Sequence, residues 1–237
     1  QNPTAHPDNA TINSPAIYAN ATAVGSANNA NGMSAYFAYG DTKVAYTESR
    51  GLNVTFDALA ALGELEFVVV PGLGEAADYA GLNVAGKVAL VKRGTINFSL
   101  KLANAEANGA VGMIIYDNVN SGELFAMDMT DPATGGLPAG VSGNVPAVTI
   151  SLPDGEAMIA SEIRTMTVSA TQGIVPSIVG GQVSSFSSWG VAPNLGLAPD
   201  ITGIGGNVYS TIDNGTYGVM NGTSMATPQV AGISALV

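Results

Sequence analysis

The middle of the chain alternates between short apolar runs and turns rich in Gly, Asn and Asp. Apolar runs that end in such turns are typical of buried β-strands. Turn residues interrupt every run before it reaches the length that a membrane-spanning helix needs. The pattern therefore predicts strands at residues 33–39, 43–46, 65–70, 86–94, 111–116, 145–150 and 165–170.

Helical spacing replaces this strand pattern between residues 97 and 108. Phe98, Leu102 and Ala105 recur on one side of a helix, and Gly109 follows as a C-terminal stop. Because this helix lies between two predicted strands, it forms a β-α-β unit with them. A shorter helix is predicted at residues 153–161. The fold class that follows is α/β.

A long connection separates the β-α-β unit from the later strand and helix. Residues 117–144 are rich in Gly and Asp and contain few apolar anchors. Loops of this length in compact domains are usually functional or mobile. We therefore predict a functional or mobile loop with few apolar anchors here.

The two ends of the chain have a different pattern. Residues 1–16 are rich in turn-forming residues, and residues 17–27 have the composition of a buried strand that enters a loop. At the other end, residues 221–232 read N-G-T-S-M-A-T-P-Q-V-A-G, which predicts a turn at Gly222 followed by a buried helix of small residues. Ser224 would then lie at a helix N-terminus, where unpaired N–H groups and the helix dipole favour a nucleophile whose reaction creates an oxyanion.

The run G-T-S-M-A-x-P-x-V-A-G resembles the nucleophile motif of the subtilisin-like serine proteases, the subtilases. The resemblance implies that Ser224 is the catalytic serine of a peptide-hydrolysing enzyme that works through an acyl-enzyme. The alternative is that these residues only begin a core helix. A second segment favours the resemblance, because residues 186–211 are similar to the family pattern F-S-S-x-G-P followed by P-D-I-x-A-P-G-x-N-I-x-S-T.

This second segment departs from the family pattern at two places. Val191 stands where the family has proline, and Gly203 with Ile204 replaces its Ala-Pro. Prolines restrict turns. We therefore expect a looser turn beside the substrate cleft than the family has.

Residues 82–161 resemble the protease-associated (PA) domain. They contain the run G-K-V-A-L-V-K-R-G-x-x-x-F-x-x-K-x-x-N-A, then G-A-V-G-M-I-I-Y-D-N, and later V-P-A-V-T-I-S. The resemblance implies a partial subtilisin-like parallel-sheet core interrupted by a β-rich α/β insertion. The predicted layout is a core segment at 1–30, an insertion at 31–182 and a second core segment at 183–237.

A serine nucleophile needs a base and a carboxylate that orients the base. The single histidine, His6, lies between turn residues rather than in the family's H-G-T-H helix, and no D-T-G sequence is present. Asn2 is a candidate for the oxyanion-hole asparagine, but no Ala-Gly precedes it, and a plain loop residue is the alternative. The chain is therefore interpreted as a piece of a larger protease, and one expected partner is the remaining N-terminal part of that protease domain.

Composition narrows the choice of partners. Seven Lys and Arg against eighteen Asp and Glu give a formal charge of −11, which argues against nucleic acid or an anionic membrane as a partner. The absence of cysteine excludes disulfides and thiol chemistry. No signal peptide is read at Gln1, and the Asn-x-Ser/Thr sequons, one of which is Asn221, are attributed to Asn and Thr richness. The family resemblance implies a bacterial protein that is secreted or associated with the cell envelope.

Several residues of the insertion have candidate roles that the sequence leaves open. No cofactor is identified. Asp128 and Asp131 are candidate calcium ligands, although a solvated loop is the simpler reading. A peptide-facing edge is a candidate role for Lys92, Arg93 and Lys101, and the alternative is a solvated strand end and helix face. Core packing is the alternative to a functional role for Met113, Met127 and Met129.

Two functions are therefore carried forward. In the first, the polypeptide is a serine endopeptidase with Ser224 as nucleophile, protein or peptide as substrate, and a PA domain that modulates access. In the second, this chain acts only as a PA-type peptide-binding or interaction module without catalysis.

Overall fold

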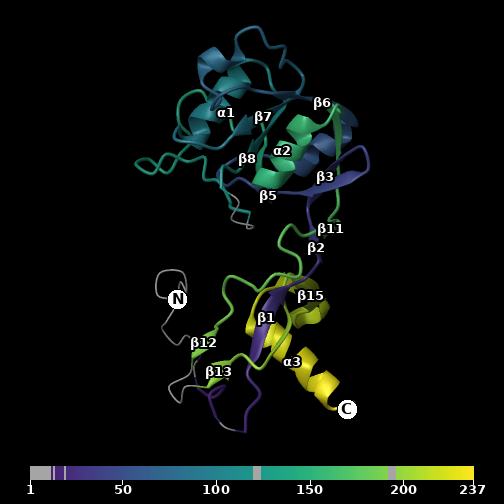
Figure 1. The fold of residues 1–237 in the computed structure, drawn as a ribbon. Helices are drawn as coiled ribbons and strands as arrows, with labels where there is room; N and C mark the ends of the chain where they lie inside the picture. The colour runs from purple at the N-terminus through teal and green to yellow at the C-terminus, as the bar shows by residue number, and fades with distance from the viewer. Residues whose placement is uncertain (1–11, 13, 19, 120–123, 192–195) are drawn as a thin grey trace. The chain divides into compact units, whose positions relative to one another are not determined.

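The computed structural model describes residues 12, 14–18, 20–119, 124–191 and 196–237. The chain forms two compact units (Figure 1). One is Ser34–Val175, and the other combines Gln1–Met33 with Pro176–Val237. The chain passes from one unit to the other within β2 (Asn31–Ser34) and returns within β11 (Gly173–Pro176). We refer to Ser34–Val175 as the inserted unit and to the other as the core unit.

The inserted unit is built on one eight-stranded mixed sheet. Its centre is parallel, since β6 pairs with β7, β7 with β8 and β8 with β9 in the same direction, and the remaining neighbours are antiparallel. The strand order is β4 (Thr42–Ala45), β3 (Tyr36–Tyr39), β10 (Thr165–Val168), β6 (Glu64–Val69), β7 (Val88–Lys92), β8 (Gly112–Tyr116), β9 (Ala147–Ile150) and β5 (Thr47–Glu48).

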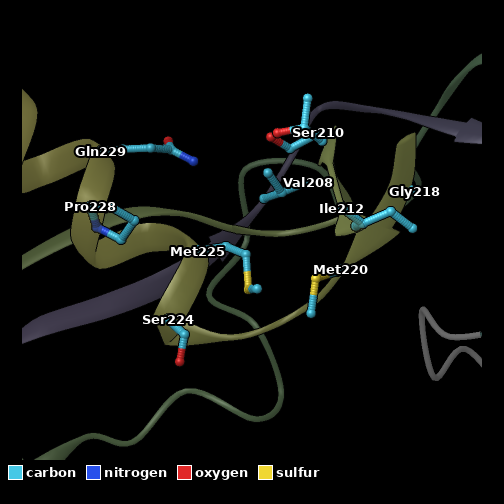
Figure 2. Close-up of a pocket in the computed structure, with 10 residues that line it drawn as sticks. Val208, Ser210, Ile212, Gly218, Met220, Ser224, Met225, Pro228 and Gln229 are labelled. Carbon is cyan, nitrogen blue, oxygen red and sulfur yellow. The ribbon is translucent and has the colours of Figure 1, made fainter. Parts of the chain in front are cut away.

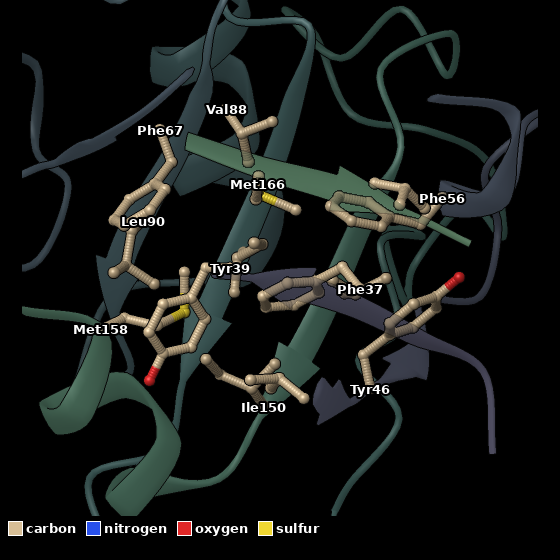
Figure 3. Packing of buried hydrophobic residues seen from close by; sticks show 14 of the residues in the cluster. Phe37, Tyr39, Tyr46, Phe56, Phe67, Val88, Leu90, Ile150, Met158 and Met166 are labelled. Carbon is tan, nitrogen blue, oxygen red and sulfur yellow. The ribbon is translucent and has the colours of Figure 1, made fainter. Parts of the chain in front are cut away.

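Both faces of the parallel strands are covered, which explains their continuous apolar sequence. Along β7, Val88 and Leu90 belong to one buried cluster, whereas Ala89 and Val91 belong to a second. Successive strand residues point to opposite faces, so the two clusters lie on opposite sides of the sheet. Figure 3 shows the first cluster, in which aromatic rings from the antiparallel strands pack against the parallel ones.

One helix contributes to each of these clusters. Helix α1 (Phe98–Ala107) places Leu102 and Ala105 in the second cluster, as its helical spacing predicted. Helix α2 (Leu152–Ala160) places Met158 in the first. Its N-terminus is capped by Ser151, whose Oγ accepts a hydrogen bond from the Asp154 N–H at 3.1 Å. Two short 3₁₀ helices, η1 (Phe56–Leu62) and η2 (Ala76–Tyr79), were not predicted.

The long connection after β8 is anchored more firmly than the sequence indicated. Met127 and Met129 are fully buried in the second cluster together with Met113, which confirms the packing role of the three methionines. The backbone is held as well: the Arg50 N–H donates to the Met127 carbonyl at 2.7 Å, and the Met129 N–H donates to the Arg50 carbonyl at 3.0 Å. The prediction of few apolar anchors was wrong, because methionines in a Gly-rich stretch do not form a periodic pattern.

Lys101 is fully buried on α1 rather than exposed on a solvated helix face or at a peptide-facing edge. Its Nζ donates to the carbonyl of Lys92 at 2.9 Å and to the carbonyl of Leu73. Burial lowers the pKa of Lys101 to about 8, and the nearby carboxylates of Asp78 and Glu75 act in the opposite direction. Lys101 thus joins the end of β7 to the loop that follows β6.

The core unit is centred on two parallel strands that are far apart in sequence. Strand β1 (Val24–Asn28) pairs with β14 (Ile201–Gly206), and helix α3 (Thr223–Ser234) packs against both. The predicted strand at 17–27 therefore begins later than expected. A short pair, β12 (Gly190–Val191) with β13 (Leu197–Ala198), and a hairpin of β15 (Val208–Thr211) with β16 (Tyr217–Met220) and an intervening 3₁₀ turn, η3 (Asp213–Gly215), complete the unit.

Glycines let α3 approach β14 closely. A Cβ atom at Gly205 would lie 2.4 Å from the Ser26 Oγ and 2.5 Å from the Gly222 carbonyl oxygen, closer than real side chains approach. The Gly222 N–H donates to the Gly205 carbonyl at 2.8 Å. The expectation of a looser turn at Gly203 and Ile204 was wrong, because both residues lie within β14 and pair with β1.

We predict that Gly205→Ala destabilises the core unit by about 2 to 3 kcal/mol, because the added methyl group has to displace either Ser26 or the turn before α3. Urea unfolding followed by the fluorescence of Trp189, which lies in this unit, measures the change. Gly232→Ala is the control, since a Cβ there meets nothing within 4 Å. It should stabilise the helix by about 0.5 to 1 kcal/mol. Equal stability of the two variants would contradict the close approach.

We predict that Lys101 makes the stability of the inserted unit depend on alkaline pH. Lysine titrates near 10.5 in the unfolded chain and near 8 in the folded one. The unfolded chain therefore binds the proton more tightly between these values, and the free energy of unfolding rises as pH increases from 8. Burial raises the pKa of Tyr79 to about 12, which opposes the rise above pH 10, so pH 8 to 9.5 is the informative window.

The measurement is urea unfolding by far-ultraviolet circular dichroism at several pH values in that window. Lys101→Met should remove the rise, and Lys92→Met, at an exposed position, should keep it. A rise that persists unchanged in Lys101→Met would show that another group causes it.

Candidate functional site

Ser224 is the second residue of α3 and is exposed to solvent. Figure 2 shows its hydroxyl pointing away from the neighbouring Met225 and Met220 side chains. The first N–H groups of an α-helix have no acceptor inside the helix, and they carry the positive end of its dipole. The hydroxyl is therefore accessible beside backbone donors that could stabilise a negative charge. It is not enclosed by hydrocarbon.

At the start of α3, side-chain hydrogen bonds replace part of the usual backbone hydrogen bonding of a helix. Pro228 lies inside the helix and has no N–H to donate to the Ser224 carbonyl, four residues earlier. The Thr227 hydroxyl donates to the Thr223 carbonyl at 2.8 Å, and the Gln229 Nε2 donates to the Ile204 carbonyl at 2.9 Å. The second bond ties the second turn of α3, just after the turn that carries Ser224, to β14.

The turn before Ser224 is fixed from its other side by an asparagine. The Oδ1 of Asn221 accepts a hydrogen bond from the Asn207 N–H at 2.7 Å. Asn207 has a φ of 56°, a left-handed conformation that asparagine tolerates better than most residues. Together with the Gly222 to Gly205 bond, this contact joins the strand end of β14 to the start of α3.

A network of buried hydroxyl groups supports β1 beneath this turn. The Ser26 N–H donates to the Ser187 Oγ at 2.9 Å, and the Ser26 and Ser184 hydroxyls are 2.8 Å apart. The Ser184 hydroxyl also lies 2.9 Å from the Asn28 Oδ1. The F-S-S sequence thus has a structural role that the motif comparison did not identify. No sign of this contact is visible in the sequence, because Ser26 lies 161 positions from Ser187.

A pocket of about 400 Å³ opens beside Ser224, between the start of α3 and one face of the β15–β16 hairpin (Figure 2). The helix supplies Ser224, Met225, Pro228 and Gln229. The hairpin and the turn that follows its first strand supply the remaining lining residues: Val208, Ser210, Thr211, Ile212, Gly218 and Met220. Pockets of this size hold a small molecule or a side chain.

The expected partners of the serine are not brought to it by the described part of the chain. His6 and Asn2 lie outside the described residues, and His6 is the sequence's single histidine. A base for the Ser224 hydroxyl, and the carboxylate that would orient that base, would therefore have to come from outside residues 12–237.

Arg93, a candidate on the peptide-facing edge, is half-buried and paired. Its Nη1 donates to the Asp117 Oδ1 at 2.9 Å, and its guanidinium lies 4.0 Å from the centre of the Phe125 ring. Lys92 is exposed. Only Arg93 and Lys92 of the three candidate cations therefore reach the surface.

The two candidate calcium ligands bind their own loop. The Asp128 Oδ1 accepts from the N–H and the hydroxyl of Thr130, at 2.9 and 2.7 Å, and these bonds lower the pKa of Asp128. The Asp131 Oδ1 accepts from the Ala133 N–H at 2.8 Å. Within the described residues, no group of three or more acidic or histidine side chains is placed to share a metal ion. The described helices are also too short or too polar to cross a membrane.

The comparisons with known proteins cover different shares of the chain. The PA domain family matches residues 61–158. The C5a peptidase of Streptococcus pyogenes serotype M18 is 37% identical over 155 residues, which cover 65% of this chain and 12% of that protein. The minor extracellular protease Vpr of Bacillus subtilis is 37% identical over 195 residues, covering 79% of this chain and 22% of that protein.

The PII-type proteinase of Lacticaseibacillus paracasei is 31% identical over 244 aligned positions. This alignment covers 97% of the chain and 12% of the proteinase, so it extends across both units. The chain thus spans between about a tenth and a quarter of the length of these relatives. It belongs with the subtilisin-like proteases that contain a PA domain, and residues 61–158 are that PA domain.

Proposed function

We propose that the polypeptide carrying this chain is a serine endopeptidase and that Ser224 is its nucleophile. The observation that carries the proposal is the exposed hydroxyl on the first turn of α3, beside the first N–H groups of the helix and at the edge of a pocket. The alignment with the PII-type proteinase supports it. That alignment leaves out about 3% of the chain, which is fewer residues than lie between Ser224 and the last residue, Val237. The aligned part therefore extends past Ser224.

The reaction assigned to Ser224 is acyl transfer from a peptide. The hydroxyl oxygen attacks the carbonyl carbon while an imidazole takes its proton, and the resulting oxyanion accepts a hydrogen bond from the Ser224 N–H. The imidazole then gives the proton to the leaving amine as the peptide bond breaks. Water repeats the sequence on the ester and releases the acid. The histidine and its aspartate come from the rest of the polypeptide.

The surface of the core unit supports a partner of this kind. Residues 1–33 and 176–237 contain Asp8, Asp200 and Asp213 but no lysine or arginine. Large apolar side chains are exposed on the same unit, among them Phe186, Leu197, Tyr217, Ile233 and Leu236. Exposed apolar surface with few charges is typical of the centre of an interface. We assign this surface to the remaining part of the protease domain.

The location proposed is outside the cell or in its envelope. One relative is named an extracellular protease. The formal charge of −11 suits a dissolved protein.

The PA domain is proposed to modulate access of protein or peptide substrates. It has its own two-sided core, so it can present a fixed surface. The second candidate function, recognition by the PA domain without catalysis, is favoured by the Arg93 guanidinium, which lies over Phe125 at the end of the parallel strands and remains partly exposed. Ligands often bind at this end of parallel strands.

We predict that a fluorophosphonate probe labels Ser224 in the full-length polypeptide, detected by mass spectrometry of the modified peptide. Ser224→Ala should abolish labelling and lower kcat on the order of a millionfold. Ser234→Ala, on the same helix with its hydroxyl bonded to the Val230 carbonyl, is the control and should leave both unchanged. The 237-residue chain alone should not react, since it lacks the base. An unreactive full-length protein would overturn the catalytic assignment and leave recognition as the function.

A further inference from the structure

Arg93 and Asp117 lie at the ends of two neighbouring parallel strands of the inserted unit. Arg93 directly follows β7 and Asp117 directly follows β8, and these strands pair in register up to Lys92 and Tyr116. The Arg93 N–H donates to the Tyr116 carbonyl at 2.9 Å, and the Asp117 N–H donates to the Ile150 carbonyl of β9 at 3.1 Å. Backbone hydrogen bonds therefore hold both residues at the edge of the sheet where ligands often bind in α/β folds.

The Asp117 carboxylate orients the Arg93 side chain from inside the protein. Its Oδ1 accepts hydrogen bonds from the Arg93 Nη1 at 2.9 Å, from the Asn118 N–H at 2.7 Å and from the Val119 N–H at 3.4 Å. The Asp117 side chain is 4% exposed, whereas the Arg93 side chain is 36% exposed. One side of the guanidinium is thus bound to a buried charge, and the rest remains open to solvent.

An aromatic ring fixes the guanidinium from a second direction. The Arg93 Cζ lies 4.0 Å from the centre of the Phe125 ring, within the range of a cation–π interaction. The Phe98 ring of α1 lies 5.8 Å from the Phe125 ring, so two half-buried rings form an apolar surface beside the charge. A guanidinium that an ion pair and a ring already hold loses little further entropy when it binds a ligand.

The donors that remain on Arg93 suit a carboxylate on a side chain. Among the described residues, no acceptor is bonded to the Nη2 or the Nε of Arg93. The planar donors of a guanidinium match the two oxygens of a carboxylate. Backbone N–H groups often capture the carboxylate at a chain terminus, but those of Asn118 and Val119 are already bonded to Asp117.

We propose that Arg93 binds an acidic side chain of a peptide or protein substrate, and that Phe98 and Phe125 contact an apolar residue next to it. The inference rests on the proposed recognition of peptides by the PA domain, and it does not involve Ser224. The neighbouring cation, Lys92, is exposed and takes part in neither the ion pair nor the ring contact. Lys92 is therefore a matched control for the loss of one positive charge.

The test is peptide binding to the full-length polypeptide with Ser224→Ala, which prevents cleavage during the measurement. The probe is Gly-Phe-Glu-Phe-Gly with a fluorophore on its N-terminus and an amidated C-terminus, and a second peptide has Gln in place of Glu. By fluorescence anisotropy, the Glu peptide should bind about five- to tenfold more tightly than the Gln peptide. Arg93→Gln should remove this difference, and Lys92→Gln should keep it.

A second variant separates loss of the ligand contact from loss of the fold. Arg93→Gln leaves the buried Asp117 carboxylate without its partner, which destabilises the inserted unit. Arg93→Gln combined with Asp117→Asn removes both charges. This double variant should also lose the preference for Glu, with an unchanged far-ultraviolet circular dichroism spectrum.

The outcomes distinguish this site from the proposed function. Equal binding of the Glu and Gln peptides, or a preference for Glu that persists in both Arg93 variants, overturns the carboxylate site and leaves peptide recognition standing. Binding of neither peptide overturns peptide recognition as well. A Gln peptide with a free C-terminal carboxylate should bind no better than its amidated form, and a gain there would overturn the acidic side chain as the ligand. Fluorophosphonate labelling of Ser224 tests the catalytic assignment independently of all these results.

Discussion

The contact between β14 and the start of α3 is the constraint on which the candidate site depends. Glycine at position 205 lets the helix turn lie against the strand, and the Gly222 N–H to Gly205 carbonyl bond fixes the distance. The Gln229 and Asn221 side chains add two more hydrogen bonds between the residues at the start of α3 and those at the end of β14. These contacts determine the position of Ser224, because its own side chain is exposed to solvent.

The two units stabilise themselves in different ways. In the inserted unit, aliphatic and aromatic side chains fill both faces of a sheet, and even a lysine is buried there with backbone carbonyls as acceptors. In the core unit, a two-stranded sheet and one helix bury far fewer side chains. Hydrogen bonds to buried hydroxyl groups help to hold β1 in place there. A small hydrophobic core stabilises a unit less than a large one does.

Sequence patterns predicted the inserted unit well because its parallel strands are buried on both faces. Such strands read as unbroken apolar runs, and the runs at 86–94 and 111–116 became β7 and β8. Helix α1 was visible for a similar reason, through Phe98, Leu102 and Ala105. Lys101 was misjudged because lysine side chains are usually exposed, and only its distant carbonyl acceptors show otherwise.

Only the part of the site that lies within the Ser224 sequence motif could be predicted. Ser224 at a helix start follows from local sequence, and the structure describes it on the first turn of α3. The pocket beside it was missed, because the exposed hairpin that forms it mixes Tyr, Ser and Gly and lacks a strict alternation of apolar and polar residues. Contacts such as Ser26 with Ser187 depend on residues that the intervening unit separates.

That separation has a consequence for how the core unit assembles. The entry and exit of the insertion meet within the core unit, where the Ser177 N–H donates to the Ala30 carbonyl at 2.9 Å. Pairing β1 with β14 in an unfolded chain would close a loop of about 177 residues, whereas a folded insertion shortens the effective loop to roughly 30 residues. The difference in the entropic cost of closing the loop is about 1.5 kcal/mol. Pairing β1 with β14 after the insertion has folded therefore costs less closure entropy than pairing them in the unfolded chain.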